Sequence, residues 1–78
     1  METIIDILTD LKPGIDYATE TGLVRRRILD SLTIIALVSE LEDEFDIAIP
    51  AVEIVADNFD SAAAIDALVT RLSEEDAF

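Results

Sequence analysis

Apolar residues recur at the spacing of an α-helix in three separate stretches of this 78-residue sequence. Within each stretch most of them stand three or four positions apart, which places them on one face of a helix. The three sets are Ile4, Ile5, Leu8 and Leu11; Ile34, Val38, Leu41 and Phe45; and Ile65, Leu68, Val69 and Leu72. A helix with one apolar face must bury that face against another element. The pattern therefore predicts an all-α fold, a small four-helix bundle of three longer helices and one short helix, as a single domain over residues 1–78.

Helix-breaking residues separate the first stretch from the second. Pro13-Gly14 should end the first helix, which we expect over roughly Thr3 to Leu11. From Lys12 to Leu29 no period is sustained, so this segment is predicted to be one long crossover in an antiparallel arrangement. Its scattered apolar residues indicate that it packs on the bundle; they are Ile15, Tyr17, Leu23, Val24 and Ile28.

Capping residues mark the other two longer helices. The residues suited to this role are Asp30 and Ser31 for the second helix, and Asp60 and Ser61 for the last. The second helix should end near Asp46, because the run Ile47-Ala48-Ile49-Pro50 that follows is typical of extended backbone. A short turn of helix is expected over Val52 to Ala56.

The composition excludes several classes of function. Cys and His are absent, which rules out disulfides, thiolate zinc centres and catalysis by thiol or imidazole groups. Five basic and eighteen acidic residues give a formal net charge of −13, which repels nucleic acids and anionic membranes and favours basic protein surfaces. Because 51% of the residues are hydrophobic, the chain is not a disordered acidic tail. We expect a folded protein that is not an enzyme.

The lengths of the apolar stretches and the positions of the acidic residues indicate where the protein is located and whether it binds a metal. No apolar stretch is long enough to span a bilayer, and Glu2 and Asp6 stand where a signal peptide carries positive charge. These features predict a cytoplasmic protein, which we expect to be a monomer. The acidic residues lack the alternating ligands and central glycine of a calcium loop, so no metal site is predicted.

Three runs of residues frame the second helix and the start of the last. They are Ile28-Leu29-Asp30-Ser31-Leu32, Leu41-Glu42-Asp43-Glu44-Phe45-Asp46-Ile47-Ala48-Ile49-Pro50 and Asn58-Phe59-Asp60-Ser61. In order and spacing the pattern resembles the acyl carrier protein family, and the resemblance spans nearly the whole chain. In that family an Asp-Ser-Leu motif opens the second helix, whose acidic end leads to Phe and Ile-Pro. The resemblance implies a carrier of acyl groups for fatty-acid biosynthesis, polyketide or related pathways.

The resemblance also implies a covalent cofactor. Ser31 matches the serine that receives phosphopantetheine from coenzyme A through a phosphopantetheinyl transferase, which makes the carrier a phosphoprotein with the acyl group held as a thioester. Asp30 matches the aspartate that helps the transferase place its magnesium ion and recognise the carrier. A phosphodiester suits a helix N-terminus, where backbone N–H groups are free. The alternative for both residues is simple helix capping.

Exposed residues of the second helix are candidates for partner binding. Helical winding turns Leu32 and Ile35 outward, and Leu32 matches the leucine through which carriers dock to enzymes. Glu40, Glu42, Asp43 and Glu44 crowd the helix end where carboxylates oppose the helix dipole. We interpret them as a docking surface for acyl-transferring or acyl-activating enzymes with basic surfaces. The alternative is a solvated acidic face that keeps the protein soluble.

A fatty acyl chain would need an apolar pocket. We expect it beside the short helix, lined by Leu37, Leu41, Ile49, Ile54 and Phe59. Each apolar carbon that enters such a pocket gains roughly 0.8 kcal/mol. If the cargo is a small amino acid, nothing enters.

Some residues depart from the usual fatty-acid carriers. Arg25-Arg26-Arg27 precedes the serine where many of them are neutral or acidic, and Ala36 stands where they often have glutamate. The Asp-Ser contexts look closer to discrete carriers such as the D-alanyl carrier proteins, so a D-alanyl or other aminoacyl carrier is the first alternative. An unmodified acidic interaction module is the second. The alternative role of the arginines is charge pairing with the acidic excess.

Overall fold

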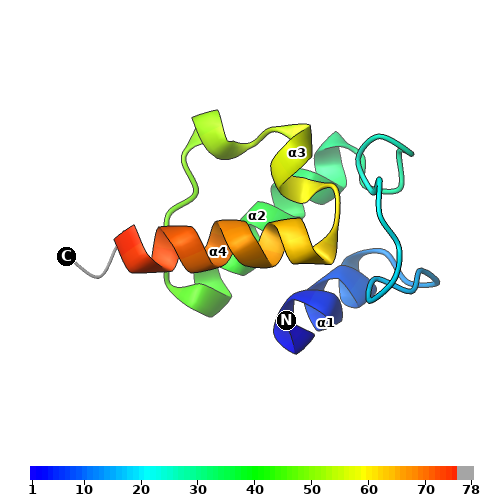
Figure 1. Cartoon of the computed structure of the whole chain (residues 1–78), viewed down its shortest axis with the longest axis horizontal. Helices are drawn as coiled ribbons and strands as arrows, with labels where there is room; N and C mark the ends of the chain where they lie inside the picture. The colour runs from blue at the N-terminus through cyan, green and yellow to red at the C-terminus, as the bar shows by residue number, and fades with distance from the viewer. Residues whose placement is uncertain (76–78) are drawn as a thin grey trace.

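The three apolar stripes form the three longer helices of the computed structural model, which describes residues 1–75 (Figure 1). The helices are α1 (Glu2–Leu11), α2 (Ser31–Phe45), α3 (Ala56–Phe59) and α4 (Ala62–Glu75), and a 3₁₀ turn, η1 (Ala51–Glu53), precedes α3. Within the described residues there is no strand, and a single isolated antiparallel bridge joins Thr21 and Ser61. The predicted all-α bundle is confirmed.

The core lies where α1, α2 and α4 meet. Helix α1 packs against α2 and α4, α4 crosses α2, and α3 packs on α4 (Figure 1). The buried apolar residues come from all four helices and from the connections: Ile4, Leu8, Tyr17, Leu23, Leu29, Leu37, Leu41, Ile47, Ile49, Phe59, Ala62, Ile65, Leu68, Val69 and Leu72. Val38 and Phe45, also predicted as core, are partly buried against this cluster. Full burial of one such leucine stabilises the fold by roughly 1.5–3 kcal/mol.

The long connection, which runs from Lys12 to Asp30 in the structure, packs on the bundle, as predicted for Lys12 to Leu29. Tyr17 and Leu23 are buried, and the Tyr17 hydroxyl donates a hydrogen bond of 2.5 Å to the Lys12 carbonyl. The Leu23 carbonyl accepts hydrogen bonds of 2.9 Å from the N–H groups of both Ile28 and Leu29. This turn fixes the backbone immediately before α2.

The expected turn of helix over Val52 to Ala56 is wrong in its bounds. The structure has two short turns, η1 and α3, separated by Ile54 and Val55 in non-helical conformations. Both residues are β-branched, which disfavours helix. The side-chain amide of Asn58 donates a hydrogen bond of 2.7 Å to the Glu53 carbonyl and so replaces the backbone bond that a continuous helix would make.

Candidate functional site

Asp30 and Ser31 have different roles at the start of α2. Asp30 has extended backbone (φ −88°, ψ 178°), and its side chain accepts a hydrogen bond of 2.8 Å from the N–H group of Thr33. It is therefore the N-cap residue. The hydrogen bonds from Thr33, aided by the positive field of Lys12, hold the pKa of Asp30 below its ordinary value.

Ser31 is the first residue of this 15-residue helix, and its side chain is exposed. Its hydroxyl makes no hydrogen bond with any residue between 1 and 75. Because Asp30 already caps the helix, capping does not explain Ser31. The hydroxyl is available at the positive end of the helix dipole, which favours a negatively charged substituent.

The predicted exposed strip of α2 is confirmed. Leu32 is 78% exposed and Ile35 is 65% exposed, while Leu37 and Leu41 on the opposite face are fully buried. Two large aliphatic side chains thus stand in solvent within the first two turns after Ser31.

The acidic end of α2 has two kinds of carboxylate. Glu40, Asp43 and Glu44 are exposed, as the docking interpretation requires. Glu42 is half-buried, and its carboxylate accepts a hydrogen bond of 2.9 Å from the N–H group of Ile49. Glu42 therefore fastens the extended segment after α2, a role without a local sequence signal.

The residues expected to line an acyl pocket do not surround a cavity. Leu37, Leu41, Ile49 and Phe59 are buried, whereas Ile54 is 41% exposed. Residues 1–75 enclose no detectable pocket. The five residues stay a predicted lining.

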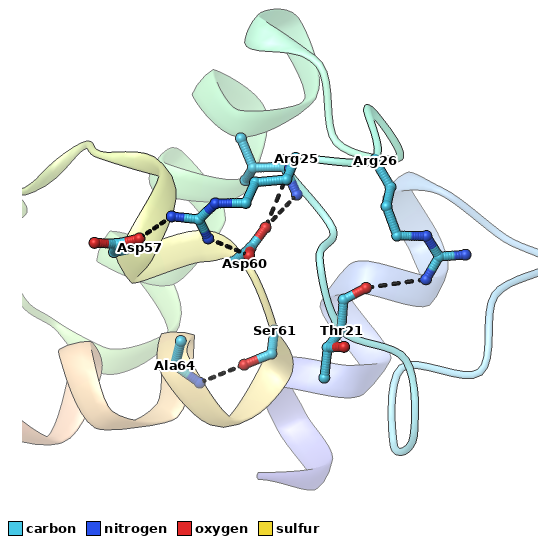
Figure 2. Close-up of polar contacts among 8 residues, drawn as sticks. Thr21, Arg25, Arg26, Asp57, Asp60, Ser61 and Ala64 are labelled. Atoms are coloured by element: carbon cyan, nitrogen blue, oxygen red, sulfur yellow. Dashed lines mark hydrogen bonds and ion pairs between the residues drawn. The ribbon is translucent and has the colours of Figure 1, made fainter.

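Arg25 and Arg26 form ion pairs, which confirms the charge-pairing interpretation for these two. The Arg25 guanidinium contacts the carboxylates of Asp57 and Asp60 (Figure 2). Arg26 pairs with Glu20 at 2.6 Å. Within residues 1–75, Arg27 makes no ion pair and has a left-handed backbone (φ 61°).

Asp60 holds the long connection instead of capping α4. Its carboxylate accepts hydrogen bonds of 2.9 Å and 3.1 Å from the N–H groups of Val24 and Arg25. These bonds, the backbone one from Arg25 foremost, lower the pKa of Asp60. Ser61 is the residue that caps α4, because its hydroxyl accepts a hydrogen bond of 3.0 Å from the N–H group of Ala64 (Figure 2).

Across residues 1–75, no group of three or more Asp or Glu side chains is placed to hold a metal ion. No helix in the same range is long and apolar enough to cross a membrane.

A small all-α bundle with an available serine at a helix start has the architecture of a carrier domain that is modified covalently. The family model for the phosphopantetheine attachment site matches residues 29–72, which is more than half of the chain and includes all of α2 and α3. The chain belongs to this family. Neither a curated protein nor a solved structure matches it. It is a carrier protein on which phosphopantetheine is attached covalently, and it works with partner enzymes such as transferases.

Proposed function

We propose that Ser31 is the residue that accepts phosphopantetheine from coenzyme A, and that the protein carries acyl groups for partner enzymes. The observation that supports this most strongly is the capping of α2 by Asp30, which leaves the exposed Ser31 hydroxyl without a structural task. Ser31 also lies within the matched residues 29–72.

The neighbourhood of Ser31 fits a phosphodiester. The hydroxyl is the nucleophile that a phosphate ester requires, and it stands at the N-terminus of a helix long enough to have a substantial dipole. The positive charge of Lys12 contributes to the lowered pKa of Asp30, the residue before Ser31. When bound, the arm supplies a terminal thiol on which an acyl group is held as a thioester.

The partner surface that we propose has two parts on α2. Leu32 and Ile35 form an apolar part beside Ser31, and Glu40, Asp43 and Glu44 form an acidic part at the other end of the helix. We propose that Asp30 is read by the transferase and that the acidic part meets basic surfaces on acyl-transferring or acyl-activating enzymes. Carboxylates of this kind steer fast, salt-sensitive encounters.

Acyl groups for fatty-acid, polyketide or related pathways are the proposed cargo, in a cytoplasmic and monomeric carrier. A D-alanyl or other aminoacyl cargo is the second candidate. Arg25 favours this second candidate. The arginine is unusual among fatty-acid carriers, and its ion pairs with Asp57 and Asp60 hold α3, which a long acyl chain would have to displace.

The test is arm transfer from coenzyme A with magnesium and broad-specificity phosphopantetheinyl transferases, followed by intact mass measurement. We expect one phosphopantetheinyl group on the wild type and none on Ser31→Ala. Ser39→Ala is the matched control, because Ser39 is also an exposed serine of α2. An unmodified wild type, or a Ser31→Ala variant that is still modified, would contradict the proposal and favour the unmodified interaction module.

A further inference from the structure

The segment from Pro50 to Asp60, which we name the cover segment, contains η1 and α3. Helix α3 has four residues and η1 has three, so few backbone hydrogen bonds hold either. The segment places Phe59 in the core but exposes Val52, Ile54 and Val55. An element this short would be easily displaced unless other contacts hold it.

The first such contact comes from the long connection. The Arg25 guanidinium reaches two carboxylates of the cover segment, Asp57 and Asp60 (Figure 2). Asp60 also binds the backbone N–H groups of Val24 and Arg25, and its own carbonyl accepts a hydrogen bond of 2.8 Å from the N–H group of Leu23. The end of the cover segment is thus fastened to the chain that leads into α2.

The second contact comes from α4. The two terminal nitrogens of the Arg71 guanidinium, Nη1 and Nη2, donate to the Glu53 carboxylate at 2.7 Å and 2.9 Å. This paired geometry is the most specific form of an arginine–carboxylate contact. Asn58 donates to the Glu53 carbonyl at 2.7 Å and to its carboxylate at 3.2 Å, which joins η1 to α3.

The third contact comes from α2. The Glu42 carboxylate accepts the N–H group of Ile49 at 2.9 Å, one residue before the cover segment. Side chains from three separate parts of the fold therefore hold the cover segment or the residue directly before it. These parts are the long connection, α2 and α4.

We propose that these three contacts make the cover segment a fastened lid, and that the carrier consequently holds short or polar acyl groups outside its core. This inference rests on the proposed attachment of the arm at Ser31. An exposed ion pair and one buried methylene group contribute free energies of similar size, so each ion pair of the cover segment offsets the gain from about one carbon of the chain. A polar acyl group gains nothing by entering, because its donors and acceptors would lose water.

The experiment loads the carrier with acyl groups of increasing length. A broad-specificity transferase attaches the arm from acetyl-, butanoyl-, hexanoyl-, octanoyl- and decanoyl-coenzyme A, and intact mass confirms each product. For each product, the unfolding temperature and the amide exchange of residues 52–59 are measured. The variants are Arg25→Gln and Glu53→Gln. Arg27→Gln is the matched control, because Arg27 makes no ion pair within residues 1–75.

We expect the wild-type unfolding temperature to stay level from acetyl to butanoyl. The acyl chain length at which the unfolding temperature begins to rise should be about two carbons shorter in Arg25→Gln, which loses two ion pairs. It should be about one carbon shorter in Glu53→Gln. Arg27→Gln should behave as the wild type. A wild type already stabilised by butanoyl relative to acetyl, or an onset that is the same in every variant, would overturn the proposal.

A second measurement does not need the arm. In the unmodified protein, Arg25→Gln should accelerate amide exchange in residues 56–60 several-fold more than in residues 34–41 of α2. Equal exchange in wild type and Arg25→Gln would overturn the lid even if loading fails. A failure of arm attachment would instead count against Ser31 as the acceptor, so the two proposals are tested separately.

Discussion

At the scale of single residues, Asp30 combines a structural and a proposed recognition role that two substitutions can separate. Asn caps a helix as well as Asp does, whereas Ala does not. We expect Asp30→Asn, which keeps the cap but loses the negative charge, to lower the melting temperature less than Asp30→Ala, which should lower it by roughly 5 °C. Both should slow arm transfer, because both remove the carboxylate that the transferase is proposed to read. Thermal unfolding and transfer rates, measured on the same samples, test this. Wild-type transfer rates in Asp30→Asn would leave Asp30 as a cap only.

Asp46 ends α2 in the left-handed conformation, with φ 52° and ψ 52°. A side chain is strained there, whereas glycine is not. Asp46→Gly should therefore stabilise the fold by about 1 kcal/mol in urea unfolding. Asp43→Gly is the control of opposite sign, because Asp43 lies inside the helix, where glycine costs about 1 kcal/mol. Equal effects of the two substitutions would show that backbone conformation at Asp46 is not the cause.

At the scale of elements, the acidic end of α2 is proposed to steer partners. Replacing Glu40, Asp43 and Glu44 by Lys should slow arm transfer about tenfold or more at low salt while changing stability little. Raising the ionic strength should reduce the difference from wild type. The control replaces the exposed Glu2, Asp6 and Asp10 of α1 by Lys, which changes the net charge equally. If the Lys substitutions on α1 slow arm transfer as much as those on α2, the net charge of the protein governs the encounter and the position of the carboxylates on α2 does not.

The elements that the sequence predicts well are those with local causes. The helical spacing of apolar residues predicts α1, α2 and α4 to within a few residues, and the exposure of Leu32 and Ile35 follows from the same winding. The cap of α2 stays ambiguous between Asp30 and Ser31 in sequence, because both residue types cap helices well. Only the backbone of Asp30 and its bond to Thr33 decide between them.

Contacts between distant residues are what the sequence does not predict. Arg25 lies 32 residues from Asp57 and 35 from Asp60, and no period connects them. Glu42 looks like one more acid of the acidic helix end, although it binds the backbone of Ile49. The split of the cover segment into η1 and α3 depends on the Asn58 side chain, which competes for a backbone carbonyl. These are the contacts that hold the proposed lid in place.

At the scale of the whole molecule, acid should unfold the protein through a few specific carboxylates. Three carboxylates have pKa values below their ordinary values because they accept hydrogen bonds. The Thr33 N–H group lowers the pKa of Asp30, and the Arg71 guanidinium lowers that of Glu53. The Arg25 N–H group lowers the pKa of Asp60. A depressed folded-state pKa stabilises the fold above the unfolded pKa, about 4, and this contribution is lost as the pH falls further.

Urea unfolding as a function of pH tests this dependence. The midpoint should change little between pH 7 and 5 and should decrease below about pH 4. Asp60→Asn should make this acid decrease shallower. Glu74→Gln, at an exposed carboxylate of α4 without an ion pair in residues 1–75, should leave it unchanged. An identical acid decrease in wild type and Asp60→Asn would contradict a role for Asp60.

Localisation of the modified residue is the direct test of whether one arm is attached at Ser31. The chain is co-expressed with a phosphopantetheinyl transferase and cleaved after Arg27 and Arg71, which releases residues 28–71 with Ser31, Ser39 and Ser61 in one peptide. Fragmentation of this peptide by electron transfer then locates the phosphopantetheinyl group. We predict modification at Ser31 alone. A group on Ser39, Ser61 or a threonine, or an unmodified peptide, would contradict the account.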